Sequence, residues 1–248
     1  MPFVHTPSPN FGPRKEGKKL KCLILHYTGT PTAFEALRLL QGADPEHQVS
    51  AHYLVDTDGT IMSIVPEEMR AWHAGKSCWE GEDDINSCSI GIEIQNPGHE
   101  YGYVDFPKEQ IKVVSDLCRD IIARQKILPS HVLAHSDIAP SRKEDPGELF
   151  PWADLAQSRI GLWPDVKEKD ELDAEEILGD AEEIKSLLSR YGYDSRVPFK
   201  TLVTAFQRHF EPEVFDAPEK IGVPGLATVA RLKALIRQKL ALRPKLYS

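Results

Sequence analysis

The stretch Ser89-Ile-Gly-Ile-Glu-Ile-Gln95 alternates strictly between isoleucine and other residues. Because successive side chains of a β-strand point to opposite faces of a sheet, the three isoleucines share one face and Glu93 points to the other. A carboxylate on that second face costs free energy unless it is paired or takes part in chemistry. The stretch predicts a strand with one apolar face. It leaves Glu93 as either a paired structural carboxylate or a functional residue.

Other strands and helices are expected on both sides of this stretch. Further strands are predicted at residues 21–27, 51–56, 60–65 and 131–135. Asp58-Gly59 lies between two of them and predicts a hairpin. Thr30 followed by Pro31 indicates a helix start with a hydroxyl cap, and Pro107 and Pro151 begin two more helices. Residues 66–88 show no clean period and predict a long surface loop.

The composition of the chain changes near Gly161, where a run of charged residues begins. Three helical patterns follow, at residues 173–190, 199–210 and about 225–241. We therefore expect an N-terminal extension (1–19), a main domain (20–162), a linker (163–172) and a small helical domain (173–248).

Composition excludes several classes of protein. With 41% hydrophobic residues among 248, the chain has enough apolar material for a core and is not disordered. The 38 acidic and 30 basic residues give a net charge of −8, which argues against nucleic acid as the main partner. We find no signal peptide and no run long enough to span a membrane. The four cysteines do not form a disulfide scaffold. The sequence does not decide whether Cys78 and Cys88 form a single disulfide bond.

Three candidate metal ligands occupy the ends of predicted strands and an adjoining loop. His26 closes one strand, His135 closes another, and Asp145 lies ten residues further on, before Pro146. Two histidines and a carboxylate, with a fourth position left for water, are typical of a catalytic zinc site. Taken one at a time, each histidine also fits a structural role and Asp145 a turn. From the residues alone, a zinc site and a purely structural role for these three side chains are about equally supported.

Several motifs, in a fixed order, resemble the zinc-dependent N-acetylmuramoyl-L-alanine amidases, the amidase_2 family, which is related to the peptidoglycan recognition proteins. They are Leu23-Ile-Leu-His-Tyr-Thr28, Ser50-Ala-His-Tyr-Leu-Val-Asp56, Trp72-His-Ala-Gly75, Asn86-Ser-Cys-Ser-Ile-Gly-Ile-Glu93 and His135-Ser-Asp-Ile-Ala-Pro-Ser-Arg-Lys-Glu-Asp-Pro-Gly147. The resemblance covers about residues 20–160. More loosely, Val203-Thr-Ala-Phe-Gln-Arg-His-Phe210 resembles a small three-helix peptidoglycan-binding domain, although Val223-Pro-Gly replaces that family's usual Asp-Gly.

The resemblance implies a fold, a reaction and a set of site residues. It implies an α/β domain with a central mixed sheet flanked by helices, followed by a small all-α three-helix domain. It implies zinc ligands His26, His135 and Asp145, with Glu93 as the catalytic glutamate and Lys143 as a lysine near the metal. Three further residues are weaker candidates for substrate contact: His52, Trp72 and His73. For Trp79 the sequence allows two roles: stacking against a sugar in the pocket wall, or packing within the loop.

The expected reaction is hydrolysis of the amide between N-acetylmuramic acid and L-alanine in peptidoglycan or muropeptides. Intact and 1,6-anhydro muramic acid are both open as substrates. Zinc lowers the pKa of its bound water toward ~7 and polarises a carbonyl group, which suits this chemistry. The alternatives are a non-catalytic peptidoglycan receptor on the same fold and a zinc hydrolase of other amides. The lack of a leader favours the cytoplasm, whereas a wall-binding domain favours the envelope; we expect the cytoplasm.

Overall fold

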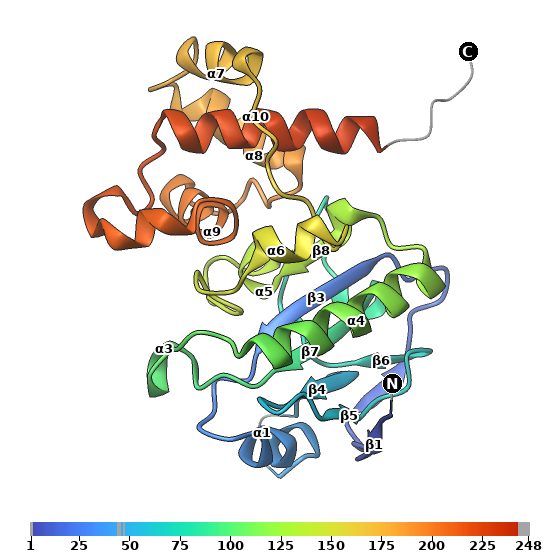
Figure 1. Cartoon of the computed structure of the whole chain (residues 1–248). Helices are drawn as coiled ribbons and strands as arrows, with labels where there is room; N and C mark the ends of the chain where they lie inside the picture. Colours follow the sequence, from blue (N-terminus) through green and yellow to red (C-terminus); the bar gives the residue numbers. More distant parts are fainter. Residues whose placement is uncertain (1, 44–45, 47, 243–248) are drawn as a thin grey trace.

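A computed structural model describes residues 2–43, 46 and 48–242. Residues 1 and 243–248, at the outer ends of the predicted extension and helical domain, lie outside the described residues. The chain forms an α/β part with a helical part packed against one end of it (Figure 1). The predicted mixed α/β architecture is confirmed.

A six-stranded mixed sheet forms the centre of the α/β part, in the order β1-β5-β4-β7-β3-β8. Its strands are β1 (Val4–His5), β3 (Cys22–Tyr27), β4 (Tyr53–Val55), β5 (Ile61–Ser63), β7 (Ser89–Ile94) and β8 (Val132–Ala134). Strand β3 runs parallel to both of its neighbours, β7 and β8. Strands β4 and β5 form the antiparallel hairpin that Asp58-Gly59 predicts. The carboxyl ends of β7, β3 and β8 therefore meet at one edge of the sheet.

One face of the sheet is covered by helix α4 (Lys108–Gln125), as Figure 1 shows. The three isoleucines of β7 pack in one apolar cluster with Val114, Leu117, Cys118 and Ile121 of this helix. Helix α6 (Trp152–Gln157) adds Trp152 and Leu155 to the same cluster. The alternation in β7 thus predicts its buried face correctly.

The opposite face receives α1 (Ala33–Leu40), α2 (Ile85–Cys88) and several loops. Thr32, not Thr30, caps α1: its hydroxyl accepts a hydrogen bond from the Glu35 amide, and the Glu35 carboxylate accepts one from the Thr32 amide. The predicted cap is therefore wrong by two residues, because Thr32 is followed by a glutamate three positions later. Thr30 instead donates its hydroxyl to the Thr32 carbonyl oxygen.

The segment 66–88 is not the long surface loop that its lack of period predicts. Strand β6 (Met69–Ala71) lies within it and pairs with β2 (Phe11–Pro13) in a second, antiparallel sheet. Ala74 and Trp79 are almost completely buried. The pattern is aperiodic because successive residues contact different elements, so neither a period of 2 nor one of 3.6 applies.

Short elements complete the α/β part: α3 (Gly98–Tyr101), η1 (Pro129–His131) and α5 (His135–Ile138). His135 is thus the first residue of α5, directly after β8. All four cysteines are buried free thiols, so Cys78 and Cys88 are not bridged in the structure.

The helical part contains α7 (Glu168–Glu175), α8 (Ala181–Tyr191), α9 (Phe199–Phe210) and α10 (Leu226–Ala241), with η2 (Pro212–Asp216) and η3 (Pro218–Lys220). Three helical patterns thus appear as four helices. The predicted helix 173–190 is interrupted at Gly179, which has a φ of +98°, and Asp180 caps the start of α8. Helix α7 begins at Glu168, inside the segment predicted as a linker.

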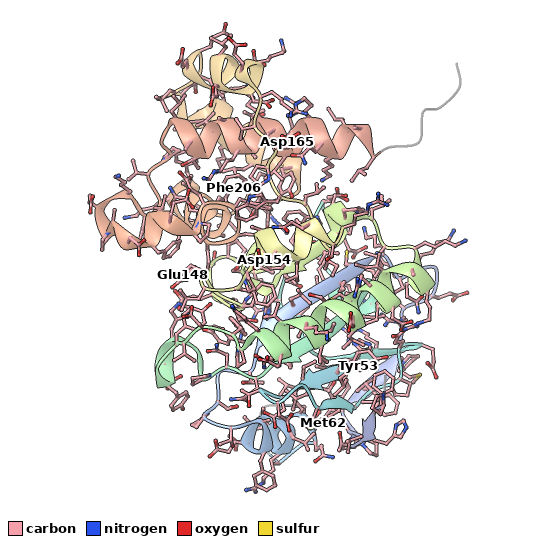
Figure 2. All side chains as sticks on the ribbon, in the orientation of Figure 1. Tyr53, Met62, Glu148, Asp154, Asp165 and Phe206 are labelled. Carbon is pink, nitrogen blue, oxygen red and sulfur yellow. The ribbon has the colours of Figure 1, made fainter. Side chains whose placement is uncertain are left out.

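The two parts share one apolar cluster. Trp79 of the α/β part contacts the Tyr191 and Tyr193 rings at centroid distances of 5.8 and 5.0 Å. Ile138 belongs to the same cluster as Phe206, which Figure 2 labels in the helical part. In the part of the chain that the structure describes, no helix combines the length and apolar character needed to cross a bilayer.

Candidate active site and metal centre

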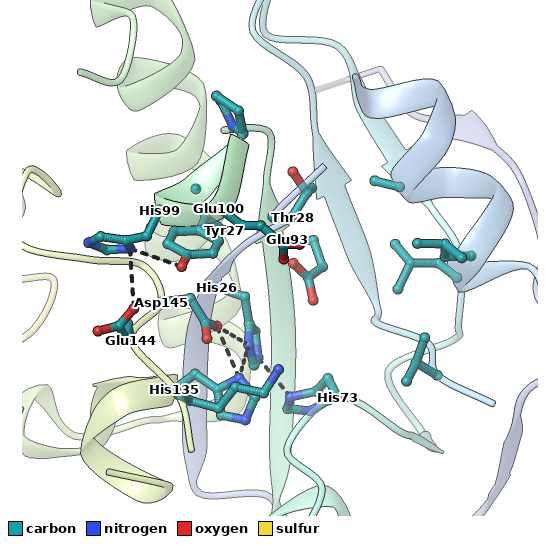
Figure 3. A pocket seen from close by; sticks show the side chains of 18 of the residues that line it. His26, Tyr27, Thr28, His73, Glu93, His99, Glu100, His135, Glu144 and Asp145 are labelled. Carbon is teal, nitrogen blue, oxygen red and sulfur yellow. Dashed lines mark hydrogen bonds and ion pairs between the residues drawn. The ribbon is translucent and has the colours of Figure 1, made fainter. Parts of the chain in front are cut away.

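Three side chains converge at the carboxyl ends of β3 and β8. The Nδ1 atoms of His26 and His135 lie 2.9 Å apart, and Asp145 Oδ2 lies 2.9 and 3.0 Å from them (Figure 3). All three residues are buried. Within residues 2–43, 46 and 48–242, this is the one group of at least three His, Cys, Asp or Glu side chains whose ligand atoms gather this closely.

The chemistry of these donors suits a metal cation. Burial, and then the neighbouring His135, lowers the pKa of His26 to about 4, so its imidazole is neutral at pH 7. Burial opposes ionisation of Asp145, but the two imidazoles hold the pKa of this carboxyl well below its ordinary range. Imidazole lone pairs and a carboxylate oxygen therefore point at a common position. Hydrogen bonds among three acceptors cannot satisfy all of them, whereas a divalent cation can.

His26 is oriented by a buried chain of hydrogen bonds behind it. With Nδ1 turned to the convergence point, His26 Nε2–H donates to His73 Nδ1 at 3.0 Å. His73 Nε2–H then donates to Ser89 Oγ at 3.1 Å, and Ser89 donates to the Ile85 carbonyl oxygen at 2.7 Å. Such partners fix the tautomer and the ring plane of a metal-binding histidine.

Gly91 makes room for this chain. A Cβ atom at Gly91 would lie 2.5 Å from His73 Cγ, well inside van der Waals contact. The absence of a side chain in the middle of β7 is thus explained by the close approach of the imidazole.

Glu93 lies beside His26 on the same face of the sheet. The two residues are paired in register on the parallel strands β7 and β3, so their side chains point the same way. Glu93 Oε2 is buried and has no hydrogen-bond partner among the described residues. Burial, and then the negative charge of Asp145, raises the pKa of Glu93 well above its ordinary value, and Lys143 opposes the shift. A carboxylate in this state readily accepts a proton from a nearby group.

A pocket of about 370 Å³ contains this arrangement. All the predicted site residues except His52 line it: His26, Trp72, His73, Glu93, His135, Lys143 and Asp145. No carboxylate among the described residues lies within ion-pairing distance of the Lys143 ammonium. The pocket thus combines a metal-binding donor set, an unpartnered carboxylate and a cation.

His52 and Trp79 lie elsewhere. His52 is completely buried; its Nδ1 accepts the Gly91 amide, and its Nε2 lies 3.2 Å from both Arg14 and the Met69 carbonyl oxygen. The predicted substrate contact of His52 is therefore corrected to a structural role, because its ring has no surface in the pocket. Trp79 packs against the helical part, so it is not a sugar-stacking wall.

Sequence reasoning missed one wall of the pocket. Tyr27 and His99 line it, and the Tyr27 hydroxyl lies 3.0 Å from His99 Nδ1. Tyr27 directly follows His26, and that adjacency is a usable sequence signal. His99 lies in the four-residue helix α3, which is too short to show periodicity in the sequence, and nothing in its neighbourhood marks it.

Residues 16–148 match the sequence family described as N-acetylmuramoyl-L-alanine amidase, Amidase_2. The chain belongs to this family. It is therefore an amidase with the α/β fold of that family, as its motifs predict.

Curated relatives agree with this assignment. The chain is 38% identical over 218 residues to N-acetylmuramoyl-L-alanine amidase AmiD of Escherichia coli, a match that covers 80% of this chain and 77% of the relative. It is 33% identical over 162 residues to 1,6-anhydro-N-acetylmuramyl-L-alanine amidase AmpD of Salmonella typhimurium, covering 59% of this chain and 84% of the relative.

Two similar solved structures carry substrate-like ligands. Escherichia coli AmiD, in complex with the substrate anhydro-N-acetylmuramic acid-L-Ala-D-γ-Glu-L-Lys, aligns with a TM-score of 0.75 and 36% identity, over 90% of this chain and 92% of that one. AmpDh3 of Pseudomonas aeruginosa, in complex with anhydromuramic pentapeptide, gives a TM-score of 0.77 and 32% identity, over 90% and 93%.

Proposed function

We propose that this amidase is zinc-dependent and cleaves the amide between the lactyl group of N-acetylmuramic acid and L-alanine in muropeptides. The convergence of His26, His135 and Asp145 beside the unpartnered Glu93 carboxylate carries the proposal. The complete ligand set together with Glu93 favours an enzyme over a non-catalytic receptor. Membership in the amidase family favours a muropeptide over other amides.

Each site residue has a distinct proposed task. His26, His135 and Asp145 would hold zinc, which when bound acidifies water and polarises the scissile carbonyl. Glu93 takes a proton from the attacking water and delivers it to the leaving nitrogen, which its raised pKa favours. Lys143 places a positive charge where the carbonyl oxygen becomes negative.

The substrate's sugar is proposed to be the 1,6-anhydro form. Support comes from similar proteins: the AmpD relatives are named for this sugar, and the AmiD and AmpDh3 structures contain anhydromuramyl peptides. In this chain, Trp72, Tyr27 and His99 provide aromatic and polar pocket walls for the sugar or peptide. Comparing cleavage of matched anhydro and intact muropeptides tests this choice.

For the C-terminal region, we propose peptidoglycan binding by residues 173–248, with residues 20–162 as the catalytic domain. The proposal rests on the motif resemblance around Val203–Phe210. Pull-down with insoluble cell wall tests it. The cytoplasmic location stays a sequence-based prediction, to be tested by cell fractionation.

The central experiment measures metal and turnover together. The purified chain should contain one zinc ion and release L-alanine-terminated peptides from a muropeptide, and a chelator should remove both zinc and activity. His135→Ala should abolish both, whereas His5→Ala, on the exposed edge strand β1, should preserve them. Full turnover by zinc-free protein would contradict the proposal.

A further inference from the structure

Two of the three proposed ligands lie in one short segment, residues 135–148, which begins with α5 and continues as a loop to Glu148. We call it the ligand segment. Most of its residues are loop, which by itself leaves the positions of His135 and Asp145 weakly determined. The contacts that hold the segment therefore decide how well the metal site is preformed.

One end of the ligand segment is bound by the helical part through Asp137, two residues after His135. The Asp137 carboxylate is completely buried. Its Oδ1 accepts the Tyr193 hydroxyl at 2.6 Å, and its Oδ2 accepts His209 Nδ1–H at 2.7 Å. Oδ2 also accepts the Ala134 amide at 2.8 Å, at the junction of β8 and α5. Asp137 thus connects the His135 backbone to two side chains of the helical part.

His209 is held rigidly in this position. Its ring stacks on Trp152 at 3.9 Å and on Phe210 at 3.8 Å between centroids. It is 1% exposed. A buried imidazole clamped between two rings has little freedom, so its hydrogen bond fixes Asp137 accurately.

The other end of the ligand segment is bound by Arg208, the neighbour of His209 on α9. The Arg208 guanidinium donates to Glu144 Oε1 and Glu148 Oε2, each at 3.0 Å. These two glutamates lie on either side of Asp145 in the chain, and Figure 2 labels Glu148 on the side that faces α9. Arg208 is only 8% exposed and the Glu148 side chain 16%, so water weakens this ion pair less than it would at the surface, whereas the Glu144 side chain is half exposed.

From these contacts we propose that Arg208 and His209 of α9, with Tyr193, are positioning residues for the metal site. The proposal rests on the zinc site described under the proposed function. One turn of α9 holds both ends of the ligand segment, from behind the pocket and without touching it. The helical part is then a component of the catalytic unit as well as a candidate wall-binding module.

The test compares variants that remove single donors with little change of shape. His209→Phe keeps the ring stacking and removes the donor to Asp137; Tyr193→Phe removes one hydroxyl; Arg208→Met keeps the aliphatic stem. Zinc affinity of the full chain is measured by competition with a chelating indicator. Loss of outer partners of a metal site typically weakens it 10–100-fold, so we expect at least about a tenfold weaker affinity for His209→Phe and Arg208→Met.

Two controls separate positioning from general destabilisation. Leu235→Ala opens a cavity in α10, and Glu213→Gln weakens the ion pair to Arg231 while leaving the bond from Arg231 to the Phe210 carbonyl oxygen in place, both within the helical part. Each should lower the melting temperature and leave zinc affinity unchanged. Amide exchange in residues 135–148 of the zinc-free chain should speed up in His209→Phe and Arg208→Met, but not in the controls.

The outcomes distinguish the two proposals. If the wild-type chain binds no zinc, the proposed function fails. If it binds zinc and the three positioning variants keep its affinity and amide exchange, the positioning role is wrong. Should Arg208→Met not fold, Arg208→Lys and Tyr193→Phe provide the same comparison with milder changes.

Discussion

Glu93 and His26 are neighbours on adjacent strands, and burial shifts their pKa values in opposite directions. It raises the pKa of the Glu93 carboxyl and lowers that of His26 to about 4, because in both cases the charged form loses hydration. The neutral imidazole keeps a lone pair for a cation, and the carboxylate gains proton affinity. Two residue types in one environment thus acquire the two properties that the proposed mechanism uses.

Replacing Glu93 by glutamine separates these properties. The amide keeps the shape of the side chain but cannot accept the proton, so turnover should fall by about 10²–10⁴. Zinc content should not change, because Glu93 is not one of the converging donors. Glu211→Gln, at a buried carboxyl whose pKa burial also raises, is the matched control and should remain active. Near-normal turnover of Glu93→Gln would mean that another group is the base.

At the scale of elements, the walls of the pocket are formed where strands and helices end. His26 and His135 occupy the carboxyl ends of neighbouring parallel strands, where polar side chains meet at one sheet edge. Helix α1 forms the facing wall through Ala36, Leu39 and Leu40. Its position depends on the cap at Thr32, since a helix of this length is marginal by itself.

Thr32→Ala should therefore destabilise the protein by about 1 kcal/mol, the usual cost of losing a hydroxyl cap. Urea denaturation followed by circular dichroism measures this change, and Thr32→Ser should restore the stability because it keeps the hydroxyl. If Thr32→Ala were neutral, the reciprocal bonds with Glu35 would contribute nothing to α1.

For the whole molecule, an ion pair between the two parts adds to their apolar contact. Glu80 of the α/β part lies 2.5 Å from the Lys239 ammonium of α10 and 3.1 Å from His131 Nε2. The hydrogen bond from His131, and then Lys239, lowers the pKa of Glu80 to about 2 despite opposing burial. Lys239 is 7% exposed, and its ammonium also donates to the Tyr191 carbonyl oxygen, so this ion pair is largely shielded from water.

This pKa shift predicts an acid-sensitive stability. The folded-state pKa of Glu80 is about 2, below the ordinary 4.5. Its contribution is therefore full above pH 4.5 and is lost as the pH falls toward 2. Melting temperatures of the wild type and Glu80→Gln should differ at pH 6 and converge near pH 2. A constant difference across this range would exclude Glu80 as a source of the pH dependence.

Deleting the chain after residue 165 tests how far the two parts depend on each other. The charged run near Gly161 favours a separable catalytic domain, but the shared cluster around Trp79 and Ile138 would be exposed by the deletion. We expect the truncated chain to melt at a lower temperature. It should lose activity on soluble muropeptide, because the contacts of α9 with the ligand segment are gone, and lose more on insoluble wall, because the proposed wall binding is gone as well. A selective loss on insoluble wall would instead show that the helical part only tethers the enzyme.

The sequence by itself determined strands β3, β4, β5, β7 and β8, the family and the candidate ligands, but not strands β1, β2 and β6. Alternation in β7 gives its buried face because the side-chain period of a strand is fixed by its backbone. His26 and Glu93 could be paired as candidates because both lie near the carboxyl ends of predicted strands. His135 and Asp145 are candidates from their places at a strand end and in the loop that follows it, and the motif order then adds Lys143, which no local pattern marks.

Only the tertiary structure decided which partners each side chain has. His52 and His73 are both histidines in family motifs. His52 is buried and accepts the Gly91 amide, whereas His73 forms a hydrogen bond with His26. Segment 66–88 lacks a period because its contacts come from distant parts of the chain. The contacts of Arg208 and His209 with the ligand segment are likewise invisible in sequence, since they join residues 60 to 72 positions apart. Periodicity records which face is buried, whereas long-range packing decides what each face touches.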